Sequence, residues 1–249
     1  MNVSLYEAAA AMNDTSRWED AVTANMAASM VPGYRKLTLA TAAVQEGLMP
    51  ASSASNPPQF FSVPQSNLTT SFQNGETKFT GDNKDVAVDG AGFFQVKMAN
   101  GTTAVTRSGE FRVNPSGVLV TKEGYTVLSD TKEPIQLDLS NHDPISINPG
   151  GDVLQGTAAQ GKIGLTDFEN PRLLTATDGV YFLTDNPALQ SKPATGTLRD
   201  GFLEGSNTNS LNDMISLLTA MRVFEANQKV VQTQDDRLGK TISELGTPS

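Results

Sequence analysis

Few side chains in this sequence could carry out chemistry, and His142 is the one imidazole among them. The 249 residues include no cysteine, which excludes thiolate nucleophiles, disulfide frameworks and cysteine-ligated zinc or iron–sulfur centres. His142 stands in the turn-like sequence Ser-Asn-His-Asp-Pro, and no Gly-x-Ser-x-Gly elbow precedes it. The sequence therefore predicts a histidine in a surface turn and disfavours catalytic triads and histidine-rich metal centres.

Carboxylates are the next candidates for chemistry. Asp82, Asp85 and Asp89 cluster beside two glycines and could offer oxygen ligands to calcium, but their spacing does not match an EF-hand loop. The nearby Gly90-Ala91-Gly92 lacks the third glycine and the helix of a dinucleotide-binding loop. An enzyme acting on an acidic or glycan substrate would need a positioned pair of carboxylates, and no feature selects one. We expect no catalytic, cofactor-binding or metal-binding residue, no cofactor and no enzymatic activity.

The charge balance and the hydropathy pattern exclude several kinds of partner. Eighteen Lys and Arg against 27 Asp and Glu give a net charge of -9, the wrong sign for binding nucleic acid. No stretch approaches the ~18 consecutive apolar residues of a membrane span. The first thirty residues carry Asp14, Glu19 and Asp20 and no unbroken apolar run. We expect no nucleic-acid partner, no membrane insertion and no cleaved signal peptide.

Helix-breaking residues divide the chain into regions. Nineteen of the 21 glycines lie between Gly33 and Gly205, and twelve of the 13 prolines lie between Pro32 and Pro193. We expect an α+β fold in which N- and C-terminal helices form a coiled coil and flank a central all-β domain of short antiparallel strands. The expected boundaries are an N-terminal helix over 1–33 paired with a C-terminal helix over 207–249, an extended connector over 34–80 and a β domain over 81–206.

Periodicity supports these expectations. Phe94, Val96 and Met98 alternate before the turn Asn100-Gly101, and further short apolar segments follow, as in a small sandwich or irregular barrel. The C-terminal region repeats apolar residues in steps of four and three, a heptad seam interrupted by Gln228 and Asp235. Ser210 with Asp213 predicts a capping box at the start of that helix. Helices this long and narrowly apolar need partners, although a helical hairpin within one chain would also satisfy them.

Three segments of the chain resemble the signatures of the bacterial flagellar rod and hook protein family. They are 25–36 near the N-terminus, 85–96 with 106–111 in the β region, and 203–209 with 222–227 near the C-terminus. They stand in the family's order and cover both ends and the middle of the chain, although Ala24 and Ala28 replace the asparagines usual in the family. The motif residues are Asn25, Gly33, Tyr34, Gly92, Phe93, Phe94, Arg107, Gly109, Phe111, Glu204, Gly205, Asn207, Asn209 and Glu225.

The resemblance implies a structural subunit of the flagellar basal-body rod, whose terminal helices assemble helically into an axial tube with the β domain outside. Its implied partners are copies of itself, other rod and hook proteins and the flagellar export apparatus. The implied location is the periplasmic rod, reached by type III export without a cleaved signal peptide. The residues expected to form the helical assembly seam are Leu5, Met12, Val22, Met26, Leu217, Met221, Phe224, Val231, Leu238 and Ile242.

Alternatives remain at this stage. The short connector, the overall length and the Asp235-Asp236 pair resemble a proximal rod protein, whereas Phe93–Val96 of the β signature and Glu225-Ala226-Asn227 resemble a distal one. A hook subunit is a further possibility within the family, although hook proteins are usually longer. Outside the family, a free-standing coiled-coil binding module would also explain the helical seams.

Overall fold

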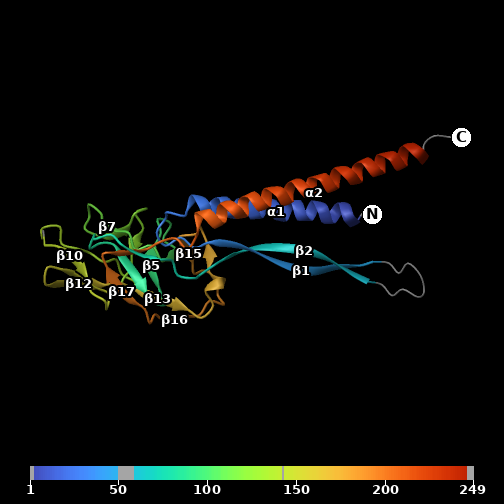
Figure 1. Cartoon of the computed structure of the whole chain (residues 1–249). Helices are drawn as coiled ribbons and strands as arrows, with labels where there is room; N and C mark the ends of the chain where they lie inside the picture. Colours follow the sequence, from blue (N-terminus) through green and yellow to red (C-terminus); the bar gives the residue numbers. More distant parts are fainter. Residues whose placement is uncertain (1–2, 50–58, 142, 246–249) are drawn as a thin grey trace. The chain divides into compact units, whose positions relative to one another are not determined.

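The structure of the chain, a computed structural model, describes residues 3–49, 59–141 and 143–245 (Figure 1). By its contacts the chain forms two compact parts. The first, the helical part, comprises Met1–Met26, Leu37–Thr69 and Asn209–Ser249, and the second, the β domain, comprises Ala27–Lys36 and Thr70–Thr208. His142, for which the sequence predicts a surface turn, lies outside the described residues.

The helical part contains two long helices, α1 (Val3–Ala27) and α2 (Ser210–Leu245), and a two-stranded sheet made of β1 (Leu37–Met49) and β2 (Gln59–Thr70). We call this sheet the β-ribbon; it falls within the segment expected to be an extended connector. The N-terminal cap of α2 lies one residue earlier than the sequence predicts. The Asn209 side-chain oxygen accepts a hydrogen bond of 3.2 Å from the backbone N–H of Asn212.

Polar side chains anchor α1 to the β-ribbon. The Asn25 amide donates to the backbone oxygen of Leu37 and accepts from its backbone N–H, both at 2.8 Å. Arg17 donates to the backbone oxygen of Ser66 in β2 at 3.2 Å. Asn25 is completely buried, so this pair of hydrogen bonds satisfies an amide whose burial would otherwise carry a desolvation penalty. The N-terminal helix therefore finds a partner in the segment that follows it.

The expectation that the terminal helices form a coiled coil is wrong. A coiled coil would bury both positions of the heptad seam, but Met221 and Leu238 are 49% and 41% exposed. Leu217, Phe224 and Val231 are only half-buried. The pattern is misleading because a heptad repeat identifies an apolar stripe without identifying its partner, and the sequence offers only the other helix as a candidate.

The β domain consists of short strands, and all their pairings are antiparallel, as expected. Its largest sheet has nine strands in the order β14-β15-β6-β5-β9-β8-β7, with β13 pairing with both β5 and β16. Three smaller sheets are formed by β10-β11-β12, β17-β4 and β18-β3. The strands and one 3-10 helix are β3 (Thr77–Phe79), β4 (Val86–Asp89), β5 (Phe93–Lys97), β6 (Thr103–Thr106), β7 (Phe111–Val113), β8 (Leu119–Thr121), β9 (Thr126–Val127), β10 (Ile145–Ile147), β11 (Asp152–Gln155), β12 (Ala158–Lys162), β13 (Leu165–Phe168), η1 (Pro171–Leu173), β14 (Thr175–Ala176), β15 (Tyr181–Leu183), β16 (Ser191–Pro193), β17 (Thr197–Asp200) and β18 (Phe202–Glu204).

The two adjacent phenylalanines of β5 fill separate clusters of the core. Phe94 is fully buried in the larger cluster and meets Phe111 edge to face, with ring centroids 5.0 Å apart. Phe93 belongs to a second cluster, where it packs with Phe168 and Phe182. Successive strand residues point to opposite faces, so β5 is covered on both sides at this point, which explains why two apolar residues stand next to each other in the strand.

Gly109 permits the closest backbone approach in the core. A side-chain Cβ at this position would lie 1.7 Å from the backbone oxygen of Val86, at the start of β4. No side chain fits there, which gives this motif glycine a steric reason.

Neither helix, over the residues described, is long and apolar enough to cross a membrane.

Replacing Phe94 by alanine should lower the free energy of unfolding by about 3–5 kcal/mol, because it leaves a cavity in the main core cluster. Urea unfolding followed by circular dichroism measures this loss. Leu139→Ala is the control, since Leu139 is 56% exposed and should change stability by no more than about 0.5 kcal/mol. Equal effects of the two substitutions would contradict the core assignment.

Candidate functional site

A buried carboxylate stands at the centre of the β domain's most distinctive cluster. Glu204, at the end of β18, is 2% exposed and lies between two arginines that are equally inaccessible. Its Oε1 lies 2.8 Å from Arg35 Nη2, and its Oε2 lies 3.1 Å from Arg107 Nη1. We call these three residues the arginine–glutamate cluster. It joins the N-terminal, central and C-terminal sequence motifs in one place.

The backbone on either side of the cluster is fixed by short-range geometry. Gly33 has φ +73°, and a Cβ on it would lie 2.3 Å from the backbone nitrogen of Ser108, so a glycine is required. Its N–H donates to the backbone oxygen of Glu204 at 2.8 Å. The N–H of Arg35 donates to the oxygen of Gly179 at 2.9 Å. These bonds direct the Arg35 side chain inward to the carboxylate.

Asn207 extends the cluster to the chain segments beside it. Its side-chain oxygen accepts from the backbone N–H of Lys36 at 2.6 Å, and its amide nitrogen donates to the backbone oxygens of Ser71 and Gln73 at 2.9 and 2.8 Å. The Glu204 carboxylate also accepts from the N–H of Gly75 at 2.8 Å. Three passes of the chain, 33–36, 71–75 and 204–207, are therefore held together by two side chains.

Burial and the Glu204 carboxylate act on the two arginines in opposite directions. Burial lowers the pKa of both Arg35 and Arg107, while the nearby Glu204 carboxylate opposes that shift in each. The charge of Arg35 further lowers the pKa of Arg107. Backbone oxygens of Val88, Gly90 and Gln73 accept further guanidinium hydrogen bonds. Two buried cations thus depend on one carboxylate, an arrangement that holds chain segments in register and offers no nucleophile or acid–base pair.

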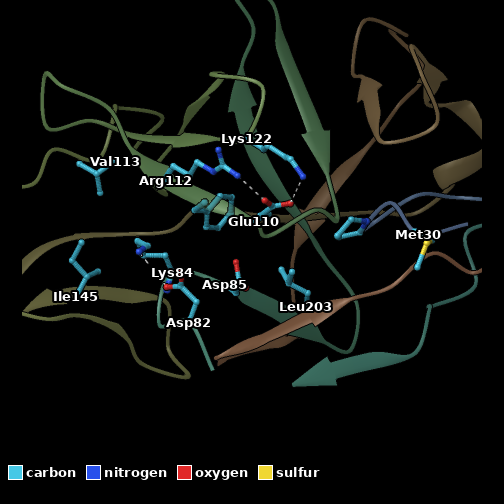
Figure 2. Close-up of a pocket in the computed structure, with 12 residues that line it drawn as sticks. Met30, Asp82, Lys84, Asp85, Glu110, Arg112, Val113, Lys122, Ile145 and Leu203 are labelled. Carbon is cyan, nitrogen blue, oxygen red and sulfur yellow. Dashed lines mark hydrogen bonds and ion pairs between the residues drawn. The ribbon is translucent and has the colours of Figure 1, made fainter. Parts of the chain in front are cut away.

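The β domain also contains a groove of about 840 Å³, which we call the Asp85 groove (Figure 2). At its rim, Glu110 accepts from both Arg112 and Lys122 at 3.0 and 3.1 Å, and Asp82 pairs with Lys84 at 3.3 Å. Asp85 lies among these pairs and is only 9% exposed. The apolar part of the lining comes from Met30, Pro32, Phe111, Val113, Ile145 and Leu203.

The outward face of α2 is the third candidate surface. Leu211, Ile215 and Leu218 are 72%, 63% and 53% exposed and recur at helical spacing on one side of the helix. Asp213, Leu217 and Ala220 are buried or half-buried and fall on the opposite side. The first turns of α2 thus carry an exposed apolar stripe on the side opposite Leu217 and Ala220. The heptad pattern of the sequence includes Leu217 and none of the three exposed residues.

The structure places the residues singled out from the sequence in different settings. Gly33, Arg107, Glu204 and Asn207 meet at the arginine–glutamate cluster, where Arg35 and Gly75 join them without having been singled out. Of the expected seam, Val22 is buried, Met12, Met26, Leu217, Phe224 and Val231 are half-buried, Met221 and Leu238 are exposed, and the side chains of Leu5 and Ile242 are outside the description. The other motif residues fall into three groups. Four are buried side chains of the β domain (Tyr34, Phe93, Phe94, Phe111), three are glycines in tight backbone positions of the same domain (Gly92, Gly109, Gly205), and three lie in the helical part (Asn25, Asn209, Glu225).

Over the residues that the structure describes, no group of three or more His, Asp or Glu side chains is arranged to hold a metal ion. Two of the three aspartates considered as calcium ligands, Asp82 and Asp85, line the same groove. Asp82 pairs with Lys84 at the groove rim, Asp85 lies buried in the groove, and Asp89 ends β4.

Comparison with known proteins gives consistent matches. The family model described as "Flagellar hook protein FlgE/F/G D1 domain" matches residues 87–155. The family model described as "Flagellar basal body rod FlgEFG protein C-terminal" matches residues 199–244. A flagellar basal-body rod protein FlgG of Buchnera aphidicola subsp. Baizongia pistaciae is 33% identical over 178 residues, which cover 67% of this chain and 66% of the relative. FlgG of Bacillus subtilis is 31% identical over 194 residues, or 71% and 70% of the two chains. FlgF of Caulobacter vibrioides is 29% identical over 248 residues, or 99% of each.

Replacing Glu204 by glutamine should lower the free energy of unfolding of the full chain by about 3–5 kcal/mol, because it leaves two buried guanidinium groups without a counter-charge. Chemical denaturation measures the effect. Glu110→Gln is the matched control, since Glu110 pairs with two half-exposed cations and its charge should contribute at most about 1 kcal/mol. If Glu204→Gln costs no more than this control, the cluster does not hold the domain together.

Proposed function

Because the chain belongs to the flagellar basal-body rod protein family, we propose that it is a structural subunit of the rod that assembles with copies of itself and with other rod proteins. The observation that carries this proposal is the exposed apolar stripe on α2, formed by Leu211, Ile215 and Leu218. A helix that is apolar on two opposite sides can satisfy only one of them within its own chain. The second side is available to a neighbouring subunit.

Repetition of one such contact produces an extended assembly. A stripe that packs on a different surface of the next subunit is a heterologous contact, and heterologous contacts that do not close into a ring generate helical filaments. Each large apolar side chain buried in this way contributes roughly 1.5–3 kcal/mol. The three most exposed residues of the stripe could therefore stabilise each contact substantially.

Among rod proteins, the chain fits a FlgF-type subunit best. Its similarity to FlgF of Caulobacter vibrioides extends over 99% of both chains, and its similarity to FlgF of Escherichia coli covers 96% of this chain. The FlgG relatives of Buchnera and Bacillus align over 67% and 71% of it. A FlgG-type or hook subunit is the alternative.

Location and transport belong to the same proposal. The subunit would reside in the periplasmic part of the basal body and reach it through the flagellar export apparatus without a cleaved signal peptide. Its role would be mechanical continuity, with no catalysed reaction. Support comes from the arginine–glutamate cluster, where the most deeply buried charges of the β domain serve to hold chain segments together.

Deletion of the gene in the source bacterium tests the function directly. We expect non-motile cells whose isolated basal bodies lack the complete rod, and restoration of both by the wild-type gene. Immunoblotting of purified basal bodies should detect the protein in complemented cells. Motile deletion cells, or basal bodies without the protein, would rule out the rod assignment.

Replacing Leu211, Ile215 and Leu218 together by serine should abolish swimming while leaving the unfolding midpoint of the isolated protein nearly unchanged, because these side chains are exposed. Motility in soft agar and thermal unfolding give the two readouts. The control replaces Asn212, Thr219 and Thr233, exposed polar residues of the same helix, by serine and should swim normally. Normal swimming of the apolar-to-serine variant would remove α2 from the assembly contacts.

A further inference from the structure

A second pocket of the β domain is lined mostly by neutral polar side chains. We call it the hydroxyl pocket, and its volume is about 310 Å³. Val105 and Phe168, which line it, are buried residues of the core cluster that also contains Phe93. The polar side chains of the lining come from neighbouring strands of the nine-stranded sheet and from the end of β15: Gln95, Thr103, Thr166, Thr184 and Ser191.

Strand register places these polar residues on a face that is otherwise core. Residues two apart along a strand point to the same face, so Gln95 shares the face of Phe93, and Thr184 shares that of Phe182. Both phenylalanines belong to the buried cluster, whereas Gln95 and Thr184 are half-buried. A sheet face that only completed a core would favour apolar side chains at these positions. The sequence instead keeps hydrogen-bonding groups there, beside a pocket.

Lys132 supplies the only charge in the lining. It is exposed, and no acid in the described part of the chain forms an ion pair with it. Within the same part it is also the one residue other than glycine with a positive φ, +62°. Its N–H donates to the backbone oxygen of Ser129 at 2.9 Å, and the Ser129 hydroxyl accepts from the N–H of Glu133 at 3.2 Å. The turn therefore holds an unpaired cation in a backbone conformation that lysine rarely adopts and that often marks a functional position.

We propose that the hydroxyl pocket binds a saccharide unit that carries a carboxylate. Its five neutral polar side chains can each donate and accept hydrogen bonds, as the hydroxyls of a sugar do. Lys132 selects the acidic group, because no acid lines the pocket to neutralise it. Val105, Phe168 and Leu189 offer apolar surface to the C–H groups of the ring. The volume lies at the lower end of the range for small-molecule sites, which suits a single sugar unit.

Other anionic ligands match the lining less well. Phosphate groups are commonly held by arginine forks or by the N-terminus of a helix, whereas this pocket has one lysine and a lining of strand and loop residues. An acidic side chain of another protein would engage Lys132 and leave most of the neutral polar groups without a ligand partner. The inference is independent of the proposed rod function, since it concerns a small ligand of the β domain.

Titration of the isotope-labelled full-length protein, followed by nuclear magnetic resonance, tests the proposal. The probes are D-glucuronate, D-galacturonate and N-acetylmuramate, each compared with its neutral counterpart, D-glucose, D-galactose or N-acetylglucosamine. We expect at least one acid to shift the resonances of the pocket residues and to bind about tenfold or more tightly than its counterpart, as a charge-assisted hydrogen bond allows. Failure of all three acids to bind, or equal affinities within every pair, would overturn the proposal.

Lys132→Gln examines the role of the lysine. The variant should bind the acidic sugar about tenfold or more weakly, bind the neutral counterpart as before, and unfold at the wild-type urea concentration. Lys162→Gln is the matched control, since Lys162 is exposed, lies outside the pocket and should leave both affinities unchanged. Undiminished binding of the acid by Lys132→Gln would overturn the proposal. The rod function would be unaffected by that result, because it is tested by motility and by basal-body composition.

Discussion

One carboxylate sets the architecture of the β domain. Glu204 must stay in place, since two guanidinium groups are buried against it and no other acid among the described residues forms an ion pair with either of them. Arg35 and Arg107 are 169 and 97 positions away in sequence, so the domain is complete only when three distant segments have met. The positions of Gly33 and Asn207 follow from this requirement, because both fix the backbone that delivers the charged groups.

Local features of this fold were predictable from the sequence, whereas the partners of its elements were not. Alternation and turn residues indicate strands such as β5 and β6, and glycine-free regions indicate the helices. The β-ribbon was not predicted, because the apolar–polar alternation of β1 is interrupted after Leu39 and the strand depends on its pairing with β2. The coiled coil was predicted wrongly because a heptad stripe does not identify its partner.

In the candidate sites, too, single residues could be selected from the sequence, but their partners could not. Glu204 and Arg107 could be selected as motif residues, but no spacing rule connects residues so far apart, and their ion pair is visible only in the structure. Asp85 could be singled out as one of three clustered acids, but its place in a groove depends on Glu110 and Ile145, which are distant in sequence. The outer stripe of α2 could have been found, since Leu211, Ile215 and Leu218 have helical spacing, but the longer heptad seam concealed it.

The arginine–glutamate cluster has a consequence for how the domain bears force. The chain first enters the β domain at Ala27 and leaves it for the last time at Thr208. Close to these two ends, the passes 33–36 and 204–207 are joined directly by hydrogen bonds such as that from the Gly33 N–H to the Glu204 backbone oxygen. Tension applied to the two ends therefore meets at the cluster and does not pass through the strands between them. The sheets are spared from unzipping, and resistance to load is concentrated in a few short, buried, charged bonds loaded in parallel.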